Sequence, residues 1–148
     1  MTLGFQGDEE ITHLSNLIDY EISGKLRDLE TYREFMKKIE KSKYDFLSTL
    51  YGILKDKQDS NIIFVGAAAK ANTFINYYRL DSSTIRCVTD KSPNKIGKYT
   101  PLSRIPIVED FALVDIPNPI VIFTAWNIGS ILREKILSIN PEIRILNL

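Results

Sequence analysis

The 148-residue sequence has one cysteine, Cys87, and one histidine, His13. A single cysteine excludes a disulfide within the chain, and these two residues cannot supply the ligands of a usual zinc site. We therefore expect no metal on this chain. Cys87 lies within an apolar run and is expected in the core, whereas His13 is expected on a helix surface.

The sequence also lacks an excess of charge of either sign. Lys and Arg together number 19, as do Asp and Glu, so the formal net charge is zero. This balance argues against a basic face broad enough for non-specific nucleic-acid binding. No apolar run approaches the roughly 20 residues of a membrane helix, and residues 1–14 lack the pattern of a signal peptide. We expect a cytoplasmic protein that binds neither nucleic acids nor membranes.

Proline is absent from the first 57 residues, and all six prolines lie in the remainder. The length suits one core of ordinary size, and the polar stretch 55–61, KDKQDSN, marks a change of pattern. We therefore predict a helical extension over residues 1–57 and an α/β domain over residues 58–148.

The extension contains two helical patterns. Apolar residues recur at helical spacing over residues 9–22, and Gly24 is expected to stop that helix. A second pattern follows Asp28, a plausible N-cap, and extends for about 27 residues. This helix has more apolar residues than one sheet face requires, which predicts an interface element.

The remainder alternates short apolar runs with helical patterns. Strands are predicted over residues 61–66, 84–90, 104–108, 119–126 and 142–148, and helices over 70–80 and 130–139. This alternation predicts an α/β fold, a doubly wound parallel sheet with helices on both faces. Ligands of such sheets bind beyond the carboxyl ends of the strands.

The turn after the first strand, VGAAAKAN at residues 65–72, has small residues at three informative positions. Gly66, Ala68 and Ala71 lie where a dinucleotide-binding fingerprint has its glycines. The amides at the start of the following helix would face an anion, and Lys70 would add positive charge. A plain packing corner explains the same residues equally well.

Two other strand ends carry polar residues. Asp90 lies 24 positions after Gly66, close to the offset at which an acidic residue binds ribose hydroxyls; a turn or cap aspartate is the alternative. The lysines of residues 91–98 are expected either to contact phosphates or to lie in a solvated loop. Trp126 is expected either to stack on a base or sugar or to be a core residue. The candidate ligand-binding residues are Gly66, Ala67, Ala68, Lys70, Asn72, Thr73, Asp90, Lys95, Gly97, Lys98, Trp126 and Asn127.

Several spaced segments resemble the C-terminal domain of SAM-dependent sugar C-methyltransferases. They are GAAAKANTFINYY at 66–78, DKSPNKIGKYTPLSRIPI at 90–107, FTAWN at 123–127 and the helical stretch 20–39. The resemblance covers about residues 15 to 147. It departs from the family pattern at Ala71, where a glycine is usual, and at residues 101–104, where PLSR replaces a proline-glycine pair.

The resemblance implies a Rossmann-like domain that helps to hold a nucleoside-diphosphate sugar. Full enzymes of this family also have a zinc-binding domain and a central SAM-binding domain with catalytic His and Tyr groups, and those motifs are absent here. It therefore implies a substrate-holding module without catalytic residues or a cofactor of its own. The partners it implies are the nucleoside-diphosphate sugar and a SAM-binding methyltransferase chain or domain. The apolar residues of the long helix separately predict a second copy as a partner.

Two other functions fit the same residues. One is an NAD(P)-binding module that uses the same turn. The other is an interaction subunit with a degenerate pocket, whose long helix docks a partner.

Overall fold

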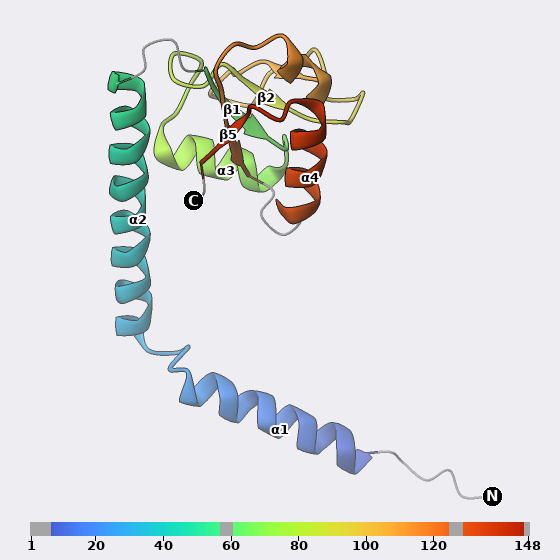
Figure 1. Cartoon of the computed structure of the whole chain (residues 1–148). Helices are drawn as coiled ribbons and strands as arrows, with labels where there is room; N and C mark the ends of the chain where they lie inside the picture. Colours follow the sequence, from blue (N-terminus) through green and yellow to red (C-terminus); the bar gives the residue numbers. More distant parts are fainter. Residues whose placement is uncertain (1–6, 57–60, 125–128, 147–148) are drawn as a thin grey trace, which may run out of the picture. The chain divides into compact units, whose positions relative to one another are not determined.

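The computed structural model describes residues 7–56, 61–124 and 129–146, and side chains from residue 12 onward within those ranges. The chain divides into two compact units, Met1–Asp45 and Phe46–Leu148, and the long helix α2 (Leu29–Asp56) contributes to both. Figure 1 shows the elements of each unit. The predicted helices, strands and sheet are all present.

Helix α1 (Gly7–Ser23) is the other helix of the first unit. It ends in a Schellman motif, in which the amides of Lys25 and Leu26 donate to the carbonyls of Ile22 and Glu21 at 3.0 and 3.1 Å. The left-handed residue of this motif is Lys25, with φ 53°. Gly24 lies one residue earlier without a positive φ, so the expected stop is displaced by one residue.

The second unit contains a five-stranded, all-parallel sheet. Its strands are β1 (Asn61–Val65), β2 (Cys87–Thr89), β3 (Ile107–Val108), β4 (Pro119–Phe123) and β5 (Arg144–Ile145), in the order β3-β2-β1-β4-β5. At the carboxyl end of β1, Val65 pairs with Thr89 on one side and Phe123 on the other. The order reverses between β1 and β4, and this is the switch point at which open α/β sheets bind ligands.

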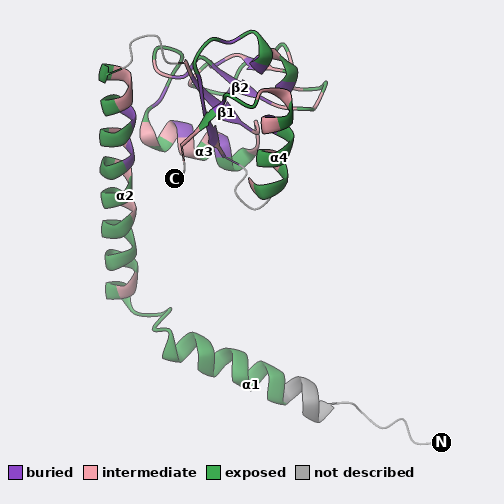
Figure 2. Ribbon diagram, in the orientation of Figure 1, coloured by how far each residue is buried: buried purple, intermediate pink, exposed green. Residues whose placement is uncertain are grey.

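Helices cover both faces of this sheet, as predicted. Helix α3 (Ala69–Tyr78) and the last turns of α2 pack on one face, where Leu50, Phe64 and Ile75 are fully buried. Edge-to-face contacts of Phe46 with Phe74 and Tyr78 extend this core. Figure 2 shows that α2 is buried only over its later turns.

The opposite face is covered by α4 (Gly129–Ile139) and the short 3-10 helix η1 (Asp110–Val114). Its core contains Ile63, Val121 and Ile136. Successive residues of β1 and β4 thus point to opposite faces, and both strands are apolar after Asn61, the first residue of β1, because both faces are buried.

The single cysteine and the single histidine lie where the sequence predicted. Cys87 is 3% exposed within β2, and burial raises the pKa of its thiol to about 11. His13 is exposed on α1. No helix in the described part of the chain is long and apolar enough to cross a membrane.

Candidate functional site

The turn after β1 depends on one glycine. Gly66 has a φ of 101°, which side-chain-bearing residues rarely adopt, and its amide donates to the carbonyl of Thr89 at 2.8 Å. Ala68 then occupies the N-cap position of α3 in an extended conformation, without a side-chain cap. Ala71 is 2% exposed, so a small residue lets α3 pack close to the sheet.

The start of α3 offers backbone donors. The amides of residues 68–71 donate to no acceptor in the described ranges, because the first helical bond runs from Asn72 to the carbonyl of Ala68. These amides carry the positive end of the helix dipole. Lys70 is exposed beside them and forms no ion pair with the described residues.

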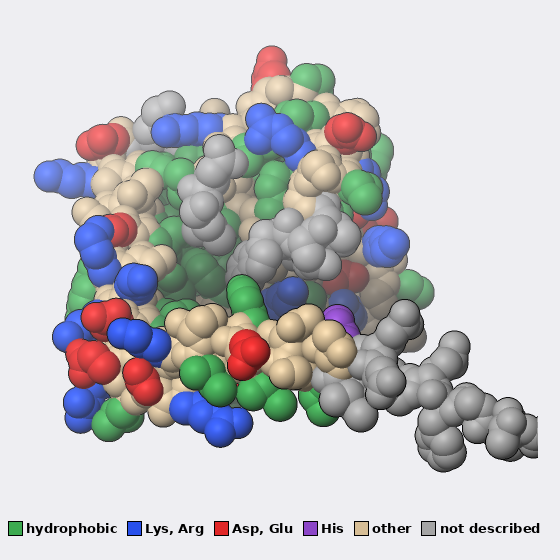
Figure 3. All heavy atoms as spheres, turned by 90° about the horizontal axis from the view of Figure 1, so that it is seen from below, with side chains coloured by type: hydrophobic (Ala, Val, Ile, Leu, Met, Phe, Trp, Pro, Cys, Tyr) green, Lys and Arg blue, Asp and Glu red, His purple; other side chains and the backbone are tan. Residues whose placement is uncertain are grey.

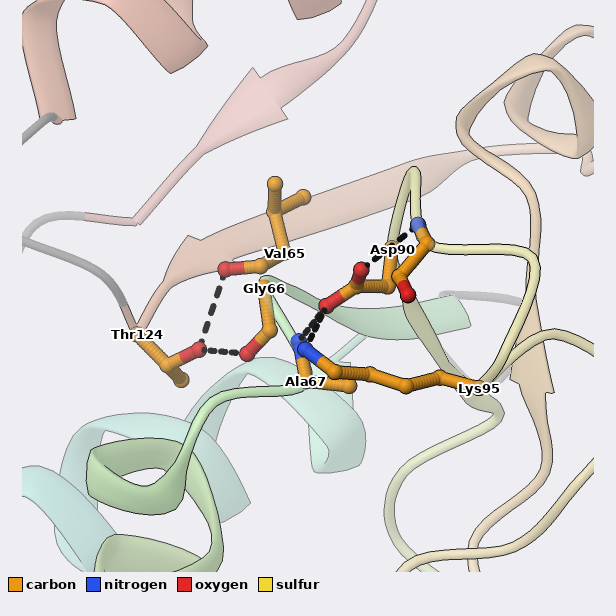
Figure 4. A network of polar contacts seen from close by, with 7 residues as sticks. Val65, Gly66, Ala67, Asp90, Lys95 and Thr124 are labelled. Carbon is orange, nitrogen blue, oxygen red and sulfur yellow. Dashed lines mark hydrogen bonds and ion pairs between the residues drawn. The ribbon is translucent and has the colours of Figure 1, made fainter.

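Asp90 connects the turn to the loop after β2 (Figure 4). Its Oδ2 accepts hydrogen bonds from the amide of Ala67 and from Nζ of Lys95, both at 2.9 Å. Its Oδ1 accepts a bond from the amide of Ser92 at 2.8 Å. The carboxylate side chain is only 10% exposed. Asp90 therefore fixes the turn and the loop relative to each other.

The protonation of Asp90 follows from these contacts. Burial alone would raise the pKa of this carboxyl, but the hydrogen bond and charge of Lys95 and the amides of Ser92 and Ala67 outweigh it. The pKa therefore lies below its usual value. At neutral pH the group is a carboxylate that holds Lys95, 41% exposed, beside the turn.

Thr124 holds the other side of the turn, at the end of β4 (Figure 4). Its Oγ1 lies 3.0 Å from the carbonyl oxygen of Val65 and 2.8 Å from that of Gly66, and it is fully buried. Thr124 lies within the strand predicted over residues 119–126, and the sequence gave no reason to select it; in the structure it directly follows β4. The signal was its position, since a hydroxyl at the end of a strand beside β1 can bond the turn's carbonyls.

Two predicted residues of the loop after β2 are bonded towards β3. Gly97 has φ 79°, and its amide donates to the carbonyl of Ile107 at 2.9 Å. The carbonyl of Lys98 accepts from the amide of Ile107 at 2.8 Å. Gly97 is thus in a left-handed backbone conformation, which favours glycine.

The PLSR segment at residues 101–104 contains no glycine, and its Leu102 and Arg104 adopt positive φ themselves.

The remaining predicted residues lie on α3 or outside the described ranges. The side-chain oxygen of Asn72 accepts a hydrogen bond from Asn76 at 3.2 Å, and Thr73 Oγ1 donates to the carbonyl of Ala69 at 3.2 Å. Trp126 and Asn127 lie outside the described residues. The structure thus brings together the turn, Lys70, Asp90 and Lys95.

The described residues do not fit a zinc site. No group of three His, Cys, Asp or Glu side chains among them is placed to hold a metal ion. Cys87 is buried in β2 with a raised pKa, whereas metal ligation requires the thiolate.

The family model described as the C-methyltransferase C-terminal domain matches residues 4–144. The chain belongs to this family. The match includes the turn, Asp90, Lys95 and Thr124, so every part of the site lies inside the C-methyltransferase C-terminal domain. A search of curated proteins found no match.

Proposed function

We propose that this C-methyltransferase C-terminal domain binds a nucleoside-diphosphate sugar and holds it for a SAM-binding methyltransferase domain or chain. The observation that carries the proposal is the start of α3, where the amides of residues 68–71 and Lys70 meet at the carboxyl edge of the sheet. Unpaired amides at a helix start attract anions. A diphosphate is an anion of suitable charge.

The hydrogen bonds of the turn support this assignment. Asp90 occupies the amide of Ala67, so a diphosphate would use the amides further along, from Ala68 onward. The turn that leads to those amides is hydrogen-bonded on both sides, to Asp90 through the amide of Ala67 and to Thr124 through the carbonyl of Gly66. A site that is already ordered loses little conformational entropy when its ligand binds, which favours affinity.

Asp90 retains some capacity for the sugar. A carboxylate has about four acceptor positions, and three are used by Ala67, Ser92 and Lys95. The remaining position suits a hydroxyl of ribose or of the sugar. Lys95, bonded to Asp90, supplies a further positive charge near the diphosphate.

The proposed role is not catalytic on this chain alone. The family implies SAM for the full system, and SAM would supply the methyl group there. The described site offers anion donors and one carboxylate already bonded to three donors, which does not fit a group that removes a proton from a sugar carbon. Methyl transfer is therefore assigned to the partner domain or chain.

One observation also favours an NAD(P)-binding module, namely the switch point between β1 and β4 beside an acidic residue at the end of β2. Binding of NAD(H) or NADP(H) distinguishes the two, because the remaining acceptor position of Asp90 suits a ribose hydroxyl of either ligand.

A ligand panel tests the proposal. Melting temperature and the fluorescence of Trp126, the only tryptophan, are measured with uridine, thymidine, guanosine and cytidine diphosphate sugars, and with NAD(H), NADP(H) and SAM. We expect at least one diphosphate sugar to raise the melting temperature and change the emission. A response to NAD(P)(H) alone would establish the alternative, and no response to any ligand would reject both.

A further inference from the structure

The first unit has an apolar surface that the described residues of that unit do not cover. Its side chains are large and lie between 42% and 63% exposed. We call them the α1–α2 apolar surface, and they are Leu14, Leu17, Ile18, Ile22, Leu29, Tyr32, Phe35 and Met36. Figure 3 shows several hydrophobic side chains along the helix in the foreground, which is α1.

The part of this surface on α2 belongs to a stripe that is a packing surface elsewhere on the same helix. Leu29, Tyr32 and Met36 follow the alternating three- and four-residue spacing of a helix seam. The same spacing, extended along α2, reaches Phe46 and Leu50, which are buried against the sheet. One stripe is therefore buried in the core of the second unit over its later turns and is exposed within the first unit over its first turns.

The exposed area is large enough for a stable interface. From the exposed fractions and the usual areas of such side chains, the surface amounts to on the order of 800 Å². A standard protein interface takes about 800 Å² from each partner. Monomeric proteins rarely leave a contiguous apolar patch larger than a few hundred Å² exposed.

The charges of the first unit are complementary to each other. Helix α1 has five acidic residues and no Lys or Arg. Residues 25–43 have seven Lys and Arg against four Asp and Glu. An acidic apolar helix and an apolar segment of net positive charge, residues 25–43, therefore lie on the same chain, and their opposite charges favour contact between two copies. Part of the positive charge lies in the loop before α2, because residues 29–45 alone have five Lys and Arg against four Asp and Glu.

We propose that the α1–α2 apolar surface is the interface of a homodimer, in which α1 of each copy packs on the first half of α2 of the other. The exchange is reciprocal, so one two-fold axis buries both surfaces and both pairs of opposite charges. The contact removes apolar side chains from water, and the opposite charges set its orientation.

Sedimentation equilibrium of the full chain tests the dimer. We expect a mass of twice 17.0 kDa at micromolar concentration. Leu17→Asp and Met36→Asp should each weaken dimerisation at least about tenfold, because each places a charge in the contact. Leu102→Asp is the matched control, since Leu102 is 86% exposed in the other unit and has a left-handed φ that Asp tolerates. It should leave the dimer intact.

A charge exchange tests the proposed arrangement. The double change Asp19→Lys with Glu21→Lys on α1 should weaken the dimer, as should Lys37→Glu with Lys38→Glu on α2. A mixture of the two variants should recover a heterodimer more stable than either homodimer. Weakening of each variant alone together with recovery in the mixture is expected where α1 of one copy faces α2 of the other.

Three results would overturn the proposal. The first is a monomer at all concentrations up to about 100 μM, which is well above the dissociation constants of stable dimers of this size. The second is a dimer that is not weakened by Leu17→Asp or Met36→Asp. The third is a chain that associates with a methyltransferase domain but not with a second copy of itself. The result is independent of ligand binding, because every interface substitution lies outside the unit that carries the turn.

Discussion

Asp90 Oδ2 accepts the amide hydrogen of Ala67 at 2.9 Å, across 23 residues of sequence. This bond joins the end of β2 to the turn after β1, and the same oxygen holds Lys95. The residue expected to bind ligand hydroxyls therefore also shapes the turn on which the diphosphate is proposed to bind. Loss of its charge should affect both stability and binding.

Asp90→Asn should lower the free energy of unfolding by about 1 to 3 kcal/mol at pH 7, because an amide group cannot accept all three hydrogen bonds and leaves a partly buried donor unpaired. Urea unfolding monitored by circular dichroism measures the loss. Glu142→Gln, a matched change at an exposed carboxylate, should change stability by less than about 0.5 kcal/mol. Equal stability of wild type and Asp90→Asn would show that the network contributes nothing.

The stabilising effect of Asp90 should depend on pH in one direction. Its pKa in the folded protein lies below the usual value near 3.8, so the folded state favours the carboxylate. The contribution is complete above the unfolded-state pKa and is lost as pH falls through the folded-state pKa. The stability difference between wild type and Asp90→Asn should be constant from pH 7 to about 5 and shrink below about 4. A difference that grows on acidification would contradict this account.

Gly66→Ala should destabilise the second unit by about 1 to 3 kcal/mol, because a φ of 101° is strained for alanine. It should also weaken ligand binding by shifting the amides of the turn. Gly52→Ala is the control, since a Cβ at this helical position in α2 meets nothing within 4 Å. That change should stabilise the protein by roughly 0.5 to 1 kcal/mol, and thermal unfolding separates the two signs.

Arg79→Gly should stabilise the protein by about 1 kcal/mol, because Arg79 ends α3 with a left-handed φ of 56° that glycine adopts without strain. The hydrogen bond from the amide of Leu80 to the carbonyl of Ile75, at 2.9 Å, is retained. Arg79→Ala separates loss of charge from relief of strain and should leave stability nearly unchanged. A destabilised Arg79→Gly would mean that the guanidinium makes a contribution larger than the strain.

Cys87 should react with thiol reagents only after unfolding. Burial raises the pKa of its thiol to about 11, so almost no thiolate is present at pH 8, and the side chain is 3% exposed. The rate of labelling by a disulfide reagent should therefore follow the unfolding equilibrium as urea increases. Fast labelling of the folded protein would show that β2 opens readily.

The fold was predictable because its signals are periodic. The apolar runs around Ile63 and Val121 indicate strands buried on both faces, and the spacing of Phe74 and Ile75 indicates a helix. The sequence also indicated the small residues of the turn. Gly66 has the positive φ that the pattern requires, and Ala71 is buried against the sheet.

The contacts within the site were not predictable. The sequence offset placed Asp90 near a ribose, but its bonds to Ala67 and Lys95 depend on how two strand ends meet in space. Thr124 was overlooked for the same reason. The left-handed residue after α1 is Lys25 and not Gly24, because the helix geometry sets the position of the motif and glycine is only favoured there.

The central claim is tested most directly by calorimetric titration of wild type, Lys70→Ala and Lys55→Ala with the diphosphate sugar that binds best, at two salt concentrations. Lys55, in the last turn of α2, is also an exposed lysine and serves as the control. The account predicts that Lys70→Ala weakens binding by about 1 to 3 kcal/mol, roughly 5- to 150-fold, and reduces its salt dependence, whereas Lys55→Ala binds as wild type. Equal affinity of wild type and Lys70→Ala, with the same salt dependence, would place the ligand elsewhere and contradict the account.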